Sequence, residues 1–527
     1  MIIRKTRVLF FWLLVTSPAW LMLSLIIRGS ETQFGDYFNM IGQLFHNGAF
    51  VPLGFLEHQN EHLVAIPKLI YLINIWLFEG SNISLGVFVW CSALASALIL
   101  LLLVEAYHPK ETLQKYLLRF AAFLLVFPVA AIHNFVYSMS GTSWILSNLF
   151  SLLAIYLASR DKIISGAIFA VAATFSYGTG LAAWPALFLV LLLKRNWGIP
   201  QFAALALGAA SILIERVTSS TLTNPNLASD PFEILRQVLI NSGSLLSNDV
   251  ELALVFGVGI VSVFATAFLK SVESRKPDWQ ELATFGLGAF ALTSIILFSI
   301  SRLFFGESIA PSRYMTVIGL LTFAALISVS VFSKLAKVQF AASLTISLLA
   351  LASSVPSLHG YDQKVAQLDL NAVEMRMGSA EGRVFWYERG TSETLSRLSH
   401  FPFNETGDAL FCGLLSKEIS VARDFDVDEI RGNFDGLEEP FDGPSILYGF
   451  GWLYPTNAEC LLIVDKHSRV VGAAVPGFKR MDASKALNVA QENLGWRAVI
   501  FSGSVAPLSL VVKLPGNEAF LLVDELN

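Results

Sequence analysis

Charged and polar residues gather in one stretch, residues 29–83, which separates two long apolar runs of the sequence. Asp36 follows the first of these runs. A carboxylate at the boundary of an apolar region loses part of its hydration, which raises its pKa and suits it to accept a proton. The alternative role of Asp36 is structural, because Asp is a favoured N-cap and the helix-like segment YFNMIGQLF follows it. The two roles are compatible.

A second polar cluster, with the sequence EHQNEH, contains two glutamates and two histidines. Residues four apart share one face of a helix, which would pair Glu57 with Glu61 and His58 with His62. Carboxylate and imidazole groups are ligands that a divalent metal ion accepts, so these four residues are candidate metal or substrate ligands. The alternative is a polar loop that caps the next helix. The HExxH spacing of zinc proteases is absent.

Three basic residues, Lys68, Arg302 and Arg313, each stand at the edge of an apolar run. A guanidinium binds phosphate through parallel hydrogen bonds, and an ammonium binds it as a point charge. These residues are therefore candidates for binding a lipid phosphate, together with Tyr314, which follows Arg313 in the segment APSRYMT. The alternative is that the long basic side chains extend from helix ends toward the membrane surface.

The composition of the whole chain indicates the class of protein in which these residues lie. Hydrophobic residues make up 54% of the 527 residues and charged residues only 15%, against about 25% charged in a soluble domain. This excludes a single water-soluble globule. The net charge of −5 without a basic run gives no support for nucleic-acid binding. Three widely spaced cysteines exclude a disulfide framework.

A bilayer-spanning helix needs about 20 mainly apolar residues. Eleven runs qualify: 8–28, 84–105, 119–137, 142–159, 163–179, 181–194, 199–215, 251–269, 281–304, 314–333 and 338–356. The segment 64–79 is apolar but short. If it lies along the outer surface, 15 of the 21 basic residues before His359 fall in cytoplasmic segments, as the positive-inside rule requires. We therefore predict a cytoplasmic N-terminus and an extracytoplasmic C-terminal tail.

Several polar or aromatic residues fall at the outer ends of these spans. They are His133, Asn134, Tyr137 and Tyr177. Polar groups at membrane depth commonly mark functional sites. They either line an outward-facing cavity or sit at the membrane interface, and the second interpretation is slightly favoured.

The tail differs in character from the rest of the chain. From His359 onward it has 15 basic and 24 acidic residues, a net charge of −9. Segment 364–378 reads as a helix, and the second half reads as strands, including a hairpin with its turn at 466–468. Cys412 and Cys460 either pair in an oxidising compartment or remain free thiols. The sequence therefore predicts an all-α membrane domain of about 11 transmembrane helices (1–356), with juxtamembrane helices in its first outer loop, and an extracytoplasmic α+β domain (357–527).

The first outer loop resembles that of the GT-C integral-membrane glycosyltransferases, in the branch of the protein O-mannosyltransferases and lipid A aminoarabinose transferases. The shared layout is an acidic residue after the first span, an amphipathic helix, a Pro67-Lys68-Leu69 segment and a Tyr/Trp-rich helix ending in Leu77-Phe78-Glu79-Gly80. Arg313-Tyr314 resembles an Arg-Tyr pair that opens a late span in these enzymes. The order Pro-Lys is inverted relative to the family's Lys-Pro-Pro.

The resemblance implies an inverting glycosyltransferase that acts on the outer face of the membrane, and eleven spans with an outer tail fit a bacterial inner membrane. Its donor would be a polyprenyl-phosphate sugar, and its acceptor a glycan or lipid-linked molecule of the cell envelope. Asp36 would act as the general base, and Lys68, Arg302 or Arg313 would stabilise the departing phosphate. Glu57, Glu61, His58 and His62 would orient the sugar or hold a divalent metal ion.

Two other classes of membrane protein fit the composition. A transporter or lipid-linked glycan flippase would have matched broken helices at the bilayer midplane, and no such pair is evident. A glycan polymerase or ligase tends to have a large outer loop late in the chain. An acidic loop after the first span favours the glycosyltransferase.

Overall fold

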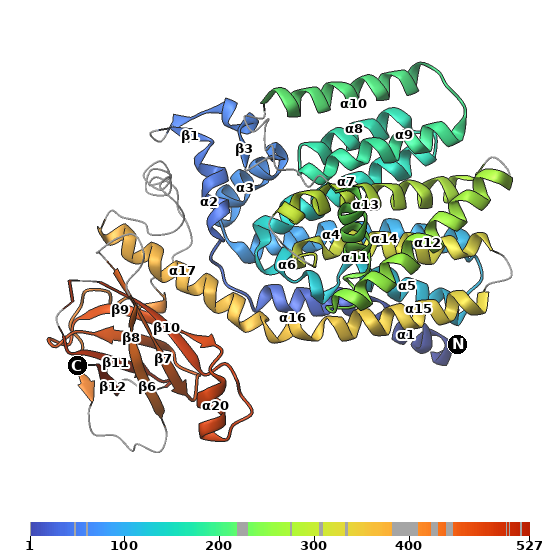
Figure 1. Ribbon diagram of the computed structural model, residues 1–527. Helices are drawn as coiled ribbons and strands as arrows, with labels where there is room; N and C mark the ends of the chain where they lie inside the picture. The colour runs from blue at the N-terminus through green and yellow to red at the C-terminus, as the bar shows by residue number, and fades with distance from the viewer. Residues whose placement is uncertain are drawn as a thin grey trace. The chain divides into compact units, whose positions relative to one another are not determined.

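The computed structural model describes most of the chain (Figure 1). The described residues are 2–46, 49–59, 62–218, 230–274, 277–304, 309–332, 336–381, 409–422, 430–438, 446–501, 503–504, 506–516 and 519–526. They form two compact units. The first comprises Met1–Arg28, Val51–Ile73 and Ile83–Leu358, and the second comprises Gly29–Phe50, Asn74–Asn82 and His359–Asn527.

The first unit is helical, apart from one short hairpin. Its principal helices are α1 (Ile2–Ile27), α4 (Asn82–Tyr107), α5 (Leu113–Val126), α6 (His133–Val136), α7 (Ser138–Ser159), α8 (Ile163–Thr174), α9 (Ala183–Lys194), α10 (Ile199–Thr218), α11 (Pro231–Gly243), α12 (Val250–Ser274), α13 (Trp279–Phe304), α14 (Met315–Ser328), α15 (Ala336–Ser353) and α16 (Val355–His359). Short 3₁₀ turns join some of them: η2 (Val129–Ala131), η3 (Gly178–Ala182), η4 (Ser312–Tyr314) and η5 (Val329–Val331).

Nine helical segments in the described part of the chain have the length and apolar composition needed to cross a membrane, with mean hydropathy from 1.3 to 2.7. Each of the eleven predicted spans contains a helix. Two of these helices, α8 and α9, have only 12 residues each. The predicted polytopic fold is confirmed, and the chain is an integral membrane protein.

The ambiguous segment 64–79 forms one helix, α3 (Ala65–Phe78). Its last residues expose large apolar side chains: Trp76 is 88% exposed, and Leu77 and Phe78 are more than half exposed. Its opposite face is buried, as at Lys68 and Tyr71. A short helix with one buried face and one exposed apolar face suits the membrane interface, where only part of its surface meets lipid.

The second unit contains an eight-stranded sheet with the strand order β5-β12-β11-β8-β9-β10-β7-β6. The strands are β5 (Val421–Ala422), β6 (Arg431–Glu438), β7 (Ile446–Tyr454), β8 (Cys460–Val464), β9 (Val470–Phe478), β10 (Gly495–Phe501), β11 (Leu508–Lys513) and β12 (Phe520–Leu526). Helix α20 (Met481–Leu487) follows β9. All pairings are antiparallel except β12 with β5.

Apolar clusters cover both faces of this sheet. Helix α17 (Tyr361–Glu381) packs on one face, where its Leu370 and Val373 join Val475 and Val499 of the strands. The other face encloses a second cluster around Trp496, because the sheet curls. The curl brings β6 close to β12, and the Phe434 N–H donates to Asp524 Oδ2 over 2.8 Å.

A disulfide bond joins Cys412 to Cys460 in this unit. The sequence left this pairing open. Cys460 begins β8, and Cys412 precedes an irregular segment whose Glu418 forms an isolated bridge with Arg469, the residue before β9. The bond therefore ties that segment to the centre of the sheet.

Candidate functional site

The EHQNEH segment forms a β-hairpin, so the predicted helical spacing is wrong. Strand β3 (His58–Gln59) pairs antiparallel with β4 (His62–Leu63), with His58 opposite Leu63 and Gln59 opposite His62. Residues opposite each other in an antiparallel pair point to the same face, and successive residues alternate. His58 and His62 therefore lie on opposite faces of the hairpin. Asn60 and Glu61 lie outside the described residues.

His58 faces a carboxylate from a distant helix. Its Nε2 lies 3.7 Å from Oε1 of Glu215, near the end of α10, and the same oxygen accepts the Leu63 N–H over 3.4 Å. Both side chains are buried. Burial, and then the nearby Lys68 charge, lower the pKa of His58. The imidazole is therefore neutral at pH 7, where it can donate through one ring nitrogen and accept through the other.

Lys68 holds the loop that precedes the hairpin. Its fully buried ammonium donates to the carbonyl oxygens of Gly54 and Glu57, each over 2.7 Å. Gly54 belongs to the 3₁₀ turn η1 (Pro52–Leu56). Burial lowers the pKa of Lys68 to about 8. The lysine thus fastens η1 to α3.

His62, on the other face of the hairpin, begins a chain of aromatic ring contacts. The ring centroids of His62 and Tyr177 are 4.3 Å apart, and Tyr177 lies 4.4 Å from Trp144. Trp144 lies 4.6 Å from Tyr314 in an edge-to-face arrangement, and Tyr314 stacks on Phe298 at 4.3 Å. Such spacings are favourable for aromatic pairs. The chain of rings links the hairpin to the predicted Arg313–Tyr314 motif.

Position 178, beside the first ring of this series, requires a glycine. A Cβ atom at this position would lie 2.3 Å from Nδ1 of His62 and 2.5 Å from its Cε1. Any larger residue would therefore displace the imidazole from its place against the backbone. Helix α3 is joined to the same loop, because the Ile66 N–H donates to the Phe175 carbonyl over 3.0 Å.

Arg313 and Tyr314 lie in the turn η4, immediately before α14. Tyr314 is buried, whereas Arg313 is half-buried, and its guanidinium carbon lies 5.3 Å from the Tyr314 ring centre. This distance suits a cation–π contact. Arg302 belongs to α13, and its side chain lies outside the described residues.

Asp36 lies in the second unit, in the first turn of α2 (Gly35–Gly42). The N-cap of α2 is Phe34, so Asp36 does not cap the helix. Its half-buried carboxylate stands where the helix dipole favours negative charge. The adjacent Tyr37 is fully buried, and its hydroxyl donates to Asn74 Oδ1 over 3.1 Å.

The proposed metal ligands do not form a group of three or more in the described part of the chain. Glu57 is exposed, and the two histidines lie on opposite faces of the hairpin. Within the first unit, the described carboxylate that faces His58 is that of Glu215.

Sequence reasoning missed Glu215 and Trp144. A signal for Glu215 was present, because an acidic residue near the end of an apolar helix is rare and commonly functional. Trp144 gave none, since a tryptophan among apolar residues is usual in a membrane helix. Its role depends on contacts with Tyr177 and Tyr314, from other parts of the chain.

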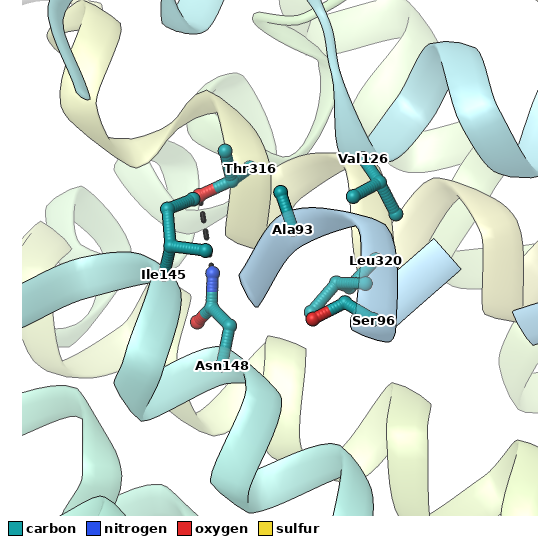
Figure 2. A pocket seen from close by; sticks show the side chains of 7 residues that line it. All are labelled: Ala93, Ser96, Val126, Ile145, Asn148, Thr316 and Leu320. Atoms are coloured by element: carbon teal, nitrogen blue, oxygen red, sulfur yellow. Dashed lines mark hydrogen bonds between the residues drawn. The ribbon is translucent and has the colours of Figure 1, made fainter. Parts of the chain in front are cut away.

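A small, mainly apolar cavity lies among the membrane helices (Figure 2). Asn148 and Thr316 line it, and Asn148 Nδ2 donates to Thr316 Oγ1 over 3.1 Å. Its volume of about 10 Å³ is room for about one water molecule. This cavity is too small for a sugar or a lipid chain.

Comparison with solved structures finds a similarity to one crystal structure of another protein. The structure is that of ArnT from Cupriavidus metallidurans bound to undecaprenyl phosphate. It covers 95% of this chain and 99% of its own, at 11% sequence identity and a TM-score of 0.41. At this level of similarity, neither substrates nor site residues carry over. No family model and no curated protein matches the chain.

Proposed function

We propose that the protein is an inverting glycosyltransferase that moves a sugar from a polyprenyl-phosphate donor to an acceptor of the cell envelope. The observation that supports this most directly is the ring chain of the first unit. It joins the polar hairpin at His62 to the cationic turn at Arg313 and Tyr314. A polar region beside a basic one, at the end of a membrane bundle, suits a substrate with a sugar, a phosphate and a lipid tail.

In this reaction an acceptor hydroxyl attacks the anomeric carbon of the sugar. The new C–O bond forms as the bond from that carbon to the phosphate oxygen breaks, and the configuration inverts. Polyprenyl phosphate leaves with the bonding electron pair, while the hydroxyl proton passes to the base. Asp36 is our candidate base, because it follows the first span directly and is half-buried in the first turn of a helix.

Arg313 is our first candidate for the phosphate. It is half-buried, whereas Lys68 is fully buried with two of its ammonium donors on backbone carbonyls. A guanidinium also matches a phosphate with parallel hydrogen bonds and remains charged at any physiological pH. Negative charge grows on the phosphate as it leaves, so a cation there lowers the barrier. Lys68 then acts by holding η1 and the hairpin.

The proposal also assigns the second unit to one side of the membrane. The positive-inside rule puts the tail outside the cytoplasm. The Cys412–Cys460 disulfide supports the same assignment, since such bonds persist in oxidising compartments. We therefore propose an inner-membrane protein whose second unit faces the periplasm and contributes to binding of the acceptor.

Dependence on a divalent metal ion is a separate part of the proposal. His58 and Glu215 are its candidate ligands among the described residues, since their nitrogen and oxygen lie 3.7 Å apart in a buried place. Transfer measured before and after treatment with EDTA, and again after adding Mg²⁺, Mn²⁺ or Zn²⁺, tests this part. Transfer that EDTA leaves unchanged would exclude it.

The test of the function is sugar transfer by the purified protein in lipid nanodiscs. Radiolabelled polyprenyl-phosphate sugars would be supplied with a cell-envelope extract as acceptor, using wild type, Arg313→Ala and Arg236→Ala. Arg236 is a half-exposed arginine of α11 and serves as the matched control. We expect Arg313→Ala to lower transfer about a hundredfold and Arg236→Ala to leave it unchanged. Equal transfer by all three proteins would remove Arg313 from the reaction.

A further inference from the structure

The short helix α6 holds a fully buried amide side chain, that of Asn134, whose position among the membrane helices calls for a role. A buried amide costs free energy unless its donors and acceptors are bonded. Asn134 Nδ2 donates to the backbone carbonyl oxygen of Arg313 over 2.9 Å. Its Oδ1 accepts from the Ser140 hydroxyl over 3.1 Å. The amide therefore joins the start of α7 to the turn that carries Arg313.

Further contacts fasten the same turn. The Ser312 hydroxyl donates to the Ala130 carbonyl and accepts from the His133 N–H over 3.4 Å. The segment η2–α6 thus holds the backbone of Ser312 and Arg313. On the following residue, the Tyr314 ring is packed between Phe298 and Trp144.

This arrangement fixes the backbone of Arg313 from both sides. A long arginine loses conformational freedom when it binds a ligand, and a fixed backbone reduces that loss. Binding groups also work best when neighbouring hydrogen bonds hold them in place. The hydrogen bonds that the structure describes for the Asn134 side chain go to the Arg313 carbonyl and the Ser140 hydroxyl, so Asn134 acts through the backbone of Arg313.

We propose that Asn134 is a positioning residue for Arg313, and that its amide sets the affinity of Arg313 for a polyprenyl phosphate. The inference rests on the proposed function, because it assumes that Arg313 binds the phosphate. The ligand class is a long isoprenoid monophosphate, which presents a doubly charged headgroup to the turn and leaves its tail in the bilayer.

The best variant for the test is Asn134→Asp. It keeps the size of the side chain and an acceptor for Ser140, but it replaces the N–H donor with an oxygen that faces the Arg313 carbonyl. Asn148→Asp is the matched control. Asn148 is another buried asparagine, on α7. Its Nδ2 donates to Thr316 in α14, the helix that follows the turn of Arg313, and not to the turn itself (Figure 2).

The experiment is a binding titration of the full chain in nanodiscs with undecaprenyl phosphate, read by native mass spectrometry. Undecaprenol and inorganic phosphate serve as separate ligands, to show whether tail and headgroup are both needed. Wild type, Asn134→Asp, Arg313→Ala, the double variant and Asn148→Asp are compared. The double variant distinguishes a residue that acts through Arg313 from one that merely supports the fold.

We expect Asn134→Asp and Arg313→Ala each to weaken binding about tenfold or more, and the double variant to bind no more weakly than Arg313→Ala. Asn148→Asp should bind within about twofold of wild type. If Asn134→Asp binds as wild type does, or if the two losses multiply, the inference is wrong while the phosphate site stands. If Arg313→Ala binds as wild type does, the proposed phosphate site fails, and the role of Asn134 fails with it.

A second variant covers the case in which Asn134→Asp does not fold. Ser140→Ala removes the hydroxyl that donates to Asn134 and leaves the Arg313 contact itself in place. The amide is then held from one side only, so we expect binding about threefold weaker than wild type. The same change in an Arg313→Ala background should have no effect, and an undiminished threefold loss there would overturn the inference.

Discussion

The imidazole of His58 and the carboxylate of Glu215 lie 3.7 Å apart, although His58 belongs to the first loop and Glu215 to the membrane helix α10. This pair closes the hairpin β3–β4 against α10. On the opposite face, the hairpin is held by the contact of the His62 ring with the Tyr177 ring. The hairpin is thus contacted on one face by helix α10 and on the other by the loop between α8 and η3.

Removal of the Glu215 carboxylate should loosen the hairpin. In Glu215→Ala the Leu63 N–H loses its acceptor and His58 loses its buried partner, so we expect the free energy of unfolding to fall by about 1–3 kcal/mol. Hydrogen exchange of a peptide covering β3 and β4 should become faster. Glu233→Ala, at a half-exposed glutamate of α11, is the control. Unchanged exchange in Glu215→Ala would show that the pair does not hold the hairpin.

Lys68 predicts a pH dependence of stability. Its pKa is lowered to about 8 in the folded protein, from 10.5 for a free side chain. Between these values the unfolded chain binds more protons than the folded one, so the free energy of unfolding rises with pH, by up to about 1.4 kcal/mol per unit. Thermal unfolding from pH 7 to 10.5 should show this rise in wild type relative to Lys68→Met. A difference that is flat or falls over this range would contradict the lowered pKa of the buried lysine.

The contact of Gly178 with His62 can be tested by adding one methyl group. Gly178→Ala forces the imidazole away from the backbone, and we expect a loss of about 1–3 kcal/mol in stability. Gly259→Ala is the matched control, since a Cβ atom at Gly259 of α12 would meet nothing within 4 Å. That change should be neutral or slightly stabilising. If Gly259→Ala loses as much stability as Gly178→Ala does, the contact of Gly178 with the His62 ring has no special role.

Much of the membrane unit was predictable from sequence. Apolar runs about 20 residues long have one stable form in a bilayer, a helix that bonds its own backbone, and each predicted run contains one. The predicted turn between β8 and β9, at residues 466–468, is also present. Within it, Asp465 accepts from the N–H groups of His467 and Arg469.

Two parts of the fold were not predictable. Strand β6 (RGNFDGLE) and strand β7 (ILYGFGWLY) carry glycines that weaken the strand pattern. A tertiary contact explains the glycine at position 451, because a Cβ atom there would lie 2.5 Å from the Trp496 ring. The EHQNEH segment was predicted as helical from residue spacing, but contacts with Glu215 and Tyr177 hold it as a hairpin.

The candidate site was predictable only in part. The motifs that carry Lys68, Arg313 and Tyr314 were found from residue type and position. Their environments were not, because the burial of Lys68 and the packing of Tyr314 depend on residues far along the chain. Burial changes the proposal: it gives Lys68 a structural role and makes Arg313 the better candidate for a phosphate ligand.

The disulfide should stabilise the second unit. It closes a segment of 48 residues, and removal of a bond of this kind costs about 2–4 kcal/mol. Cys412→Ser should therefore unfold at lower temperature and be cut faster by trypsin, whereas Cys91→Ser, at an exposed free cysteine, should behave as wild type. Mass analysis without reductant must find Cys412 linked to Cys460. Two free thiols in protein from the membrane would contradict the periplasmic placement.

The central claim is sugar transfer with Asp36 as the base, and transfer by wild type and Asp36→Asn tests it most directly. The matched control is Asp230→Asn, at an exposed N-cap carboxylate of α11. With polyprenyl-phosphate sugars as donors and a cell-envelope extract as acceptor, we predict transfer by wild type and by Asp230→Asn. Asp36→Asn should be at least about a hundredfold slower. Transfer undiminished in Asp36→Asn would assign the base elsewhere, and no transfer by wild type from any polyprenyl-phosphate donor would contradict the proposed function.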